Sequence, residues 1–173
     1  MLRAFTLALI SSFAAVVSAS AQAPGADAAA PGDRLAAGKQ VYMTVCVACH
    51  QPTGMGLPGV FPPLLRSEYI AESPERLAAL ILKGAAGAMT VDGKVYNNIM
   101  PGQELMLSDQ KIADVMSFSR ANFGNAAPPV SPELVAATRK KFADRKAPWS
   151  EAELKAWKDD PATTAPTTTE PAK

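Results

Sequence analysis

The feature that most constrains this chain is a five-residue motif, Cys46-Val47-Ala48-Cys49-His50. Cys46 and Cys49 are the only cysteines among the 173 residues, and His50 is the only histidine. A disulfide between cysteines this close in sequence would stabilise the fold very little, because that stabilisation grows with the length of the closed loop. The adjacent thiols and imidazole therefore indicate a chemical site rather than a structural cross-link.

Three kinds of site use cysteines at this spacing. Cys-x-x-Cys-His is the attachment signature of c-type haem, because two thiols on one helical turn reach the two vinyl groups and bring the imidazole under the iron. A thioredoxin-like redox pair needs a preceding strand in a βαβ pattern, which is not visible here. A zinc site needs four ligands, and no other cysteine or histidine is available. The motif predicts one covalent haem c on Cys46 and Cys49, with His50 as an axial ligand of the iron.

The second axial ligand must come from another part of the chain. A second histidine is impossible, which leaves a methionine, another side chain or an open iron. Met100 is the best candidate, because it lies in a loop and Pro101 biases the preceding residue toward an extended shape that can hold a ligand. Met89 is the runner-up and Met106 remains possible. The other methionines after the first 21 residues are interpreted as packing residues or as too close to the motif: Met43, Met55 and Met116.

The first 21 residues have the pattern of a secretory signal peptide. Arg3 precedes an apolar run that ends near Val17, and Ala19-Ser20-Ala21 is a small-residue cleavage site. The run is shorter than the ~20 apolar residues of a spanning helix. We therefore expect export to the periplasm without stable membrane insertion of the mature chain. The expected organisation is 1–21 signal peptide, 22–32 flexible lead-in, 33–124 core domain, 125–159 C-terminal helical arm and 160–173 disordered tail.

The charge balance limits the class of partner. Removal of Arg3 with the signal leaves equal numbers of basic and acidic residues in the mature chain. Such a surface offers no general attraction to nucleic acids or acidic membranes, which need clustered positive charge. The expected partners are redox proteins, contacted through a local patch, and not nucleic acids.

Capping residues predict where helices begin and end. Asp33 is expected to cap a first helix that ends in the motif, and Ser73-Pro74 to begin a second helix that Gly84 stops. Ser108 is expected to begin a third helix, ended by Gly124. Two further helices are predicted in the arm, beginning at Ser131-Pro132 and at the capping box of Ser150 and Glu153.

Two segments between these helices are not helical. Residues 51–67 are rich in proline and glycine, yet they carry enough apolar residues to favour an ordered loop that wraps something. The pair Asp92-Gly93 lies between β-favouring residues and predicts a small hairpin before Met100.

Residues on both sides of the motif resemble bacterial class I c-type cytochromes. The resemblance runs from about residue 33 to residue 124 and is carried by these residues: Gly38, Tyr42, the Cys46 to His50 motif, Pro62-Pro63-Leu64, Met100-Pro101, Leu107-Ser108-Asp109 and Ile112-Ala113. It implies an all-α fold whose helices wrap around one covalently bound haem, and in which Gly38 and Tyr42 meet Val115 and Phe118. It also implies that the carbonyl of Pro62 accepts the N–H of His50, and such bonds tune the metal.

The function implied is periplasmic one-electron transfer by a haem with His50 and Met100 as axial ligands, and not catalysis. A weaker similarity of the loop 51–64 to cytochrome modules of periplasmic dehydrogenases and copper nitrite reductases suggests an alternative, a cytochrome subunit of such a complex with the arm as a docking element. The helical spacing of the arm's apolar residues favours an arm that covers the core. A haem enzyme or gas sensor with an open distal site is a further alternative, and it would require Met100 to be absent from the iron.

Overall fold

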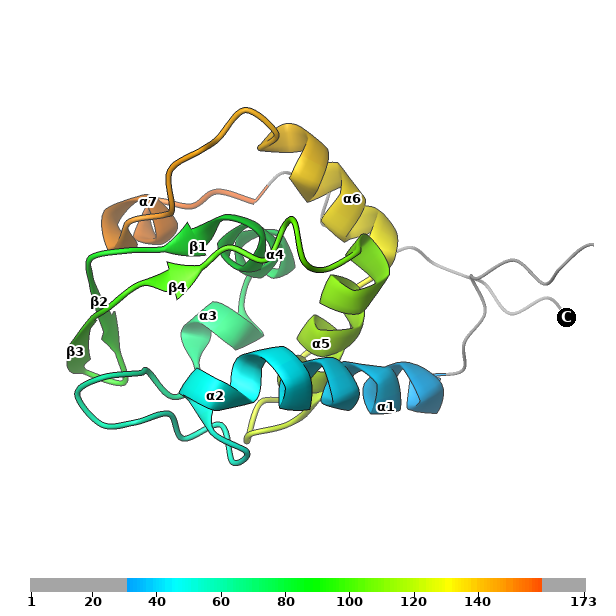
Figure 1. The fold of residues 1–173 in the computed structure, drawn as a ribbon, viewed down its shortest axis with the longest axis horizontal. Coiled ribbons are helices and arrows are strands. Elements are labelled where there is room, and N and C mark those ends of the chain that lie inside the picture. The colour runs from blue at the N-terminus through cyan, green and yellow to red at the C-terminus, as the bar shows by residue number, and fades with distance from the viewer. Residues whose placement is uncertain (1–30, 160–173) are drawn as a thin grey trace, which may run out of the picture.

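The computed structural model describes residues 31–159 (Figure 1). Its helices are α1 Pro31–Val41, the π-helical η1 Tyr42–Cys46, α2 Val47–His50, α3 Glu68–Ala71, α4 Pro74–Lys83, α5 Asp109–Ala121, α6 Pro132–Lys141 and α7 Glu151–Lys155. Its strands are β1 Gly84–Ala85, β2 Ala88–Val91, β3 Lys94–Asn97 and β4 Met100–Pro101. The fold is mainly helical, as expected, but the four short strands mean that it is not strictly all-α. The expected signal peptide and disordered tail lie outside the described residues.

The first core helix crosses the last one at a point where no side chain intervenes. A Cβ atom on Gly38 would collide with the backbone carbonyl of Asp114 and the Cβ of Phe118, so only glycine permits this approach of α1 to α5. The ring of Tyr42 then lies 5.6 Å from that of Phe118 and 5.0 Å from that of Phe123. The crossing is the one that the resemblance implied for Gly38, Tyr42 and Phe118, and it is visible between α1 and α5 in Figure 1.

The start of the first helix differs from the expectation. The chain is already helical at Pro31, so Asp33 lies in the first turn rather than at the cap, and the expected lead-in is shorter by at least Pro31 and Gly32. Proline suits the first helical turn because its fixed φ is helical and it lacks the N–H that would be unsatisfied there. The Asp33 carboxylate in the first turn interacts favourably with the positive end of the helix dipole.

The serine caps are confirmed. The hydroxyl of Ser73 accepts the N–H of Arg76 at 3.0 Å, and that of Ser108 accepts the N–H of Lys111 at 3.4 Å. The helix α5 ends at Ala121, three residues before the expected stop at Gly124. It ends early because Asn122 takes an extended backbone conformation, while its side-chain amide donates to the Phe118 carbonyl at 2.8 Å.

The chain between α4 and α5 forms two small sheets of two strands each. The predicted hairpin is present: β2 pairs with β3, and Asp92 and Gly93 at its turn have φ of 50° and 69°. The second pair was not expected. It joins β1 to β4 in antiparallel register, with Ala85 opposite Met100. Met100 therefore lies on a short strand rather than in a free loop.

After α5 the chain returns over the core. The helix α6 packs against α4 and α5, and the following segment runs beside β1, where Trp149 forms a parallel bridge with Ala85. Val135, Trp149 and Leu154 are all buried. In Figure 1, α6 and α7 cover the side of the molecule opposite to α1 and α2. The arm thus packs against the core instead of projecting from it.

Candidate functional site

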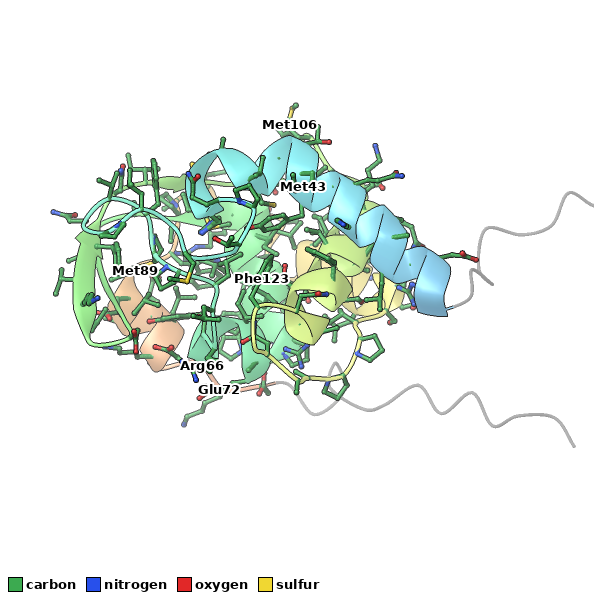
Figure 2. The ribbon with its side chains drawn as sticks, turned by 90° about the horizontal axis from the view of Figure 1, so that it is seen from below. Met43, Arg66, Glu72, Met89, Met106 and Phe123 are labelled. Carbon is green, nitrogen blue, oxygen red and sulfur yellow. The ribbon has the colours of Figure 1, made fainter. Side chains whose placement is uncertain are left out.

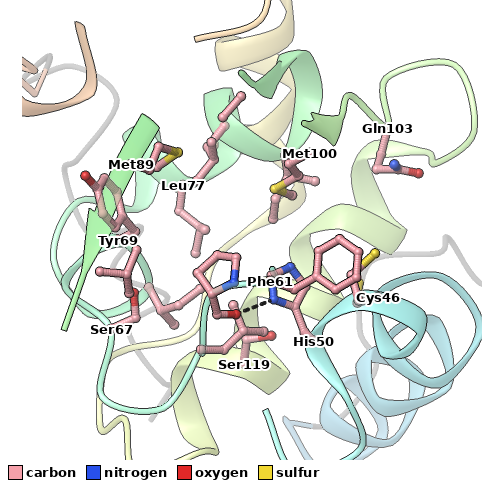
Figure 3. Close-up of a pocket in the computed structure, with 18 of the residues that line it drawn as sticks. Cys46, His50, Phe61, Ser67, Tyr69, Leu77, Met89, Met100, Gln103 and Ser119 are labelled. Carbon is pink, nitrogen blue, oxygen red and sulfur yellow. Dashed lines mark hydrogen bonds between the residues drawn. The ribbon is translucent and has the colours of Figure 1, made fainter. Parts of the chain in front are cut away.

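An apolar cavity of about 170 Å³ lies in the middle of the fold. Cys46, Cys49 and His50 line it from the end of the first helical segment, and Met100 lines it from β4. The rest of its wall is mostly aliphatic and aromatic, contributed by the 61–64 loop, α4, the two small sheets and α5. All four groups that the sequence predicted to bind haem and iron are therefore brought to one cavity (Figure 3).

The two thiols are carried by a helix that changes its pitch at the motif. The segment Tyr42–Cys46 is π-helical, a rare conformation that occurs mostly at functional sites. The helix ends after His50, because Gln51 has a φ of 62°, and the hydroxyl of Tyr42 donates to the Gln51 carbonyl at 2.6 Å. This bond ties the end of the motif back to the helix that carries it.

The pKa of Cys46 is shifted in the direction opposite to that of a reactive redox thiol. Cys46 and Cys49 are both free, and each is partly buried. Burial, and then the proximity of Cys49, raises the pKa of the Cys46 thiol to about 11. Redox cysteines need a lowered pKa, because the thiolate is the reactive species. The raised pKa of Cys46 therefore does not favour the thioredoxin-like alternative.

His50 is held in one orientation by the loop that follows it. Its Nδ1 lies 3.0 Å from the carbonyl oxygen of Pro62, drawn as a dashed line in Figure 3. A carbonyl can only accept, so Nδ1 carries the hydrogen and Nε2 is left with its lone pair. Burial lowers the pKa of the imidazole, although the bond to Pro62 opposes this. A neutral imidazole with a free Nε2 is the form that binds a metal ion.

The proline-rich loop is ordered, as its apolar content predicted. It turns back on itself through bonds from the Gly56 N–H to the His50 carbonyl at 3.0 Å and from the Leu64 N–H to the Gly54 carbonyl at 2.7 Å. Gly56 has a φ of 63°, and a Cβ there would collide with the carbonyls of Phe61 and Pro62. The loop thereby brings Pro62 to His50.

The position of Met100 differs from those of the competing methionines. Figure 3 shows the Met100 sulfur across the cavity from the His50 ring, with Met89 displaced toward Tyr69. Met106 is 76% exposed and does not line the cavity, and Figure 2 shows it at the periphery, away from Met89. Met116 is fully buried on α5 and lines the cavity as part of the core. Of the two methionines labelled in Figure 3, Met100 is the one that faces the imidazole.

One residue at the cavity was missed by the sequence reasoning. Tyr69 on α3 is 5% exposed, and its hydroxyl has no hydrogen-bond partner within residues 31–159. Burial, and then the charge of Glu151, raises its pKa, so the hydroxyl remains a donor. Figure 3 shows Tyr69 at the side of the cavity away from Cys46. A buried tyrosine in a short apolar segment gives no sequence signal that separates it from an ordinary core residue.

These residues fit a covalently attached haem. The porphyrin carries its two vinyl groups on one half and its two carboxylates on the other. Cys46 and Cys49 both line the apolar cavity, and Figure 3 shows Tyr69 on the side opposite Cys46. A buried hydroxyl without a partner is costly unless a ligand satisfies it. The two thiols, the neutral imidazole and the apolar wall therefore fit the cofactor.

Comparison with known proteins agrees with this geometry. Residues 35–122, about half of the chain, match the family model described as cytochrome c. Cytochrome c-552 of Thermus thermophilus is 36% identical over 95 residues, which cover 53% of this chain and 71% of that protein.

Two further relatives are much longer than the region that they share with this chain. The cytochrome c subunit of alcohol dehydrogenase (quinone) of Gluconobacter oxydans is 37% identical over 94 residues, 53% of this chain and 19% of the relative. The cytochrome c subunit of gluconate 2-dehydrogenase of Pantoea cypripedii is 32% identical over 96 residues, 55% of this chain and 22% of the relative. This chain therefore spans about a fifth of each dehydrogenase subunit. On the family match and the cavity together, the chain belongs to the cytochrome c family, as a class I c-type cytochrome whose cofactor is covalently bound haem c.

Proposed function

We propose that the chain is a periplasmic one-electron carrier in which Cys46 and Cys49 bind haem c and His50 and Met100 are the axial ligands of its iron. The observation that supports this most strongly is the pair of His50 and Met100 on facing walls of one apolar cavity. Haem bound there supplies an iron that alternates between the ferrous and ferric states. Replacing Met100 with alanine tests the assignment, because a true ligand cannot be lost without a change in reduction potential.

The proximal side of the site is held by short-range contacts. The Pro62 carbonyl accepts the Nδ1 hydrogen of His50, which fixes the plane of the ring and the direction of Nε2. The same bond increases the basicity of the imidazole, so that His50 is a better electron donor to a metal. Pro62 therefore positions and tunes the ligand without contacting the metal.

The distal side would favour electron transfer over other chemistry. Met100 would hold the haem iron from the wall that faces His50, and the two side chains together would leave no position for a substrate or a gas. Methionine ligation and an apolar wall both favour the ferrous state and so raise the reduction potential relative to a site with two histidines. Two protein ligands and no position for a substrate would suit a carrier rather than an enzyme.

We assign the hydroxyl of Tyr69 as a donor to a haem carboxylate. Replacing Tyr69 with phenylalanine should not lower the free energy of unfolding of the apoprotein, because the hydroxyl has no partner within residues 31–159 and its burial is costly. In the holoprotein the carboxylate would lose a donor, so its pKa should rise and the potential should become more dependent on pH in mildly acidic solution. Potentiometric titration between pH 5 and 8 checks this. The control is Tyr42→Phe, which removes a hydroxyl bonded to the Gln51 carbonyl. Equal pH profiles for the two variants would contradict the assignment.

The location and boundaries of the protein follow from its sequence pattern. Residues 1–21 are proposed to be a signal peptide that directs the chain to the periplasm, followed by a lead-in, a core domain to residue 124, the arm 125–159 and a tail. Within the described part of the chain, no helix has the length and apolarity needed to cross a membrane.

The proposed partners are periplasmic redox proteins that donate or accept one electron. A second candidate function, the cytochrome subunit of a dehydrogenase complex, is favoured by the two relatives that are named as such subunits. The alternative in a nitrite reductase has no such relative among those described above. Copurification with a large oxidoreductase would distinguish a subunit from a free carrier.

Association with a partner should depend only weakly on salt. The mature chain has no net charge. The proposed contact is an apolar rim formed by Val47, Ala48, Met55 and Pro101. Met55 is 57% exposed. Electron-transfer rates to a purified redox protein, measured from low to physiological ionic strength, should change little, and Met55→Glu should slow them at every salt concentration. A steep fall in rate with rising ionic strength would contradict an apolar contact.

A further inference from the structure

The C-terminal arm contacts the chain on both sides of Met100. We define the distal segment as residues 84–107, the connection from α4 to α5 that contains β1 to β4 and carries Met100. Its strand pair β1 and β4 is only two residues long on each side. An isolated two-stranded pair is at best marginally stable in water, and this one is shorter than most. The position of Met100 therefore requires support from outside the distal segment.

The first support is a backbone bridge from Trp149 to β1. The Trp149 N–H donates to the Gly84 carbonyl at 2.9 Å, and the Ala86 N–H donates to the Trp149 carbonyl at 3.0 Å. Ala85 thus lies between Trp149 on one side and Met100 on the other. The indole N–H of Trp149 also donates to the Ala79 carbonyl at 2.9 Å. The arm thus adds a bridge beside the two-stranded pair and anchors that bridge on α4.

The second support follows Met100 in the chain. The Arg139 guanidinium on α6 donates to the carbonyls of Glu104 at 2.6 Å and Leu107 at 2.9 Å, and to the carboxylate of Asp109 at 2.7 Å. Hydrogen bonds from a charged donor are stronger than those between neutral groups. One side chain of the arm therefore fixes the turn that leads from β4 into α5.

The third support acts on the hairpin that precedes Met100. The Glu151 carboxylate, at the start of α7, accepts the backbone N–H of Thr90 on β2 at 2.6 Å and forms an ion pair with Lys155 at 2.8 Å. The hairpin leads directly through residues 98 and 99 to Met100. The arm thus bonds to the distal segment before, beside and after the methionine.

We propose that the arm is a positioning element for the distal ligand, in which Arg139, Trp149 and Glu151 hold the Met100 thioether on the side of the cavity facing His50. The proposal rests on the assignment of Met100 as an axial ligand. The arm lies beyond the region matched by the family model, which ends at residue 122. In this proposal the contacts of the arm restrict the motion of the distal segment. Weakening those contacts should let an external ligand compete with Met100 for ferric iron.

The test measures the affinity of imidazole for the ferric holoprotein, by optical titration at a temperature where every variant is folded. Arg139→Gln should raise this affinity about tenfold, and Glu151→Ala should also raise it, because in each case the distal segment loses bonds to the arm while Met100 itself is unchanged. The double variant should exceed either one. The free energy of unfolding in guanidinium is measured in parallel, so that loss of general stability can be separated from release of the ligand.

Two control variants are closely matched. Arg34→Gln removes an arginine whose side chain is 25% exposed, close to the 28% of Arg139. Arg34 bonds to the Asp114 carboxylate and the Val130 carbonyl, and both lie outside the distal segment. Lys155→Ala removes the ion pair of Glu151 but leaves the carboxylate free to accept the N–H of Thr90. Neither control should change the imidazole affinity.

The outcomes separate this proposal from the ligand assignment. Higher affinity in Arg139→Gln and Glu151→Ala, with no change in the controls, supports the positioning role. If Met100→Ala raises the affinity but the arm variants match their controls, the arm only stabilises the fold and the positioning role is wrong. If Met100→Ala itself leaves the imidazole affinity unchanged, the ligand assignment is wrong, and the positioning role of the arm is then wrong as well.

Discussion

Replacing Cys46 or Cys49 with alanine should leave almost no mature holoprotein. The cofactor fills the centre of a small fold, and an empty cavity of about 170 Å³ would cost about 4 kcal/mol at ~24 cal/mol per Å³. That is a large part of the roughly 5–15 kcal/mol by which domains are stable. The haem content and the yield of exported protein, measured from periplasmic extracts, check this expectation.

A control on the same helix separates attachment from helix damage. Thr44 is exposed, and within residues 31–159 its hydroxyl bonds only to the Gln40 carbonyl, so Thr44→Ala should give the wild-type yield of holoprotein. Haem in the unmodified protein should also survive extraction with acidified organic solvent, because thioether bonds are not broken by it. Haem that passes into the solvent would show that the attachment is not covalent.

Replacing Met100 with alanine should change the spectrum, the reduction potential and the reactivity together. A thioether bound to ferric iron gives a weak absorption band at long wavelength, which should disappear. The potential should fall by a sizeable part of the roughly 0.8 V that axial ligation spans. The ferrous form should bind carbon monoxide rapidly, because the distal position would be vacant or filled by water. The fold should persist, because two thioethers and His50 still hold the haem.

Met89→Ala and Met106→Ala are the matched controls for this change. Met89 lines the cavity but lies away from the imidazole, and Met106 is mostly exposed, so both variants should retain the band and the potential. If Met100→Ala keeps the band and Met89→Ala loses it, the distal ligand has been assigned to the wrong methionine. Rapid carbon monoxide binding by the unmodified ferrous protein would instead favour a haem enzyme or gas sensor.

The features that the sequence predicted well are those encoded by neighbouring residues. Ser73 and Ser108 cap their helices because the cap and its partner lie within one turn. The pair Asp92-Gly93 predicts the hairpin because Asp-Gly tolerates the positive φ of a tight turn, and both residues have positive φ in the structure. The motif from Cys46 to His50 combines both thiols and the imidazole on a single helical turn. In each case the determinants lie within a few positions of one another.

The features that the sequence did not predict depend on distant residues or on single contacts. The pairing of β1 with β4 and the bridge to Trp149 involve one or two residues each, too few to show a period. Tyr69 differs from a core tyrosine only in the missing partner of its hydroxyl, which is a property of the packed fold. Asp33 was a plausible cap, but the proline two residues earlier already fits a helical turn.

The two faces of the haem site are held by bonds that join residues at very different separations along the chain. The bond that orients His50 joins residues 12 apart, whereas the indole of Trp149, beside the strand that pairs with Met100, bonds to a residue 70 positions away. The entropy of loop closure grows with the logarithm of loop length, so the longer closure costs about 1.6 kcal/mol more. The proximal face therefore forms within a short stretch of chain, whereas the distal face is complete only after residues near the C-terminus have folded back.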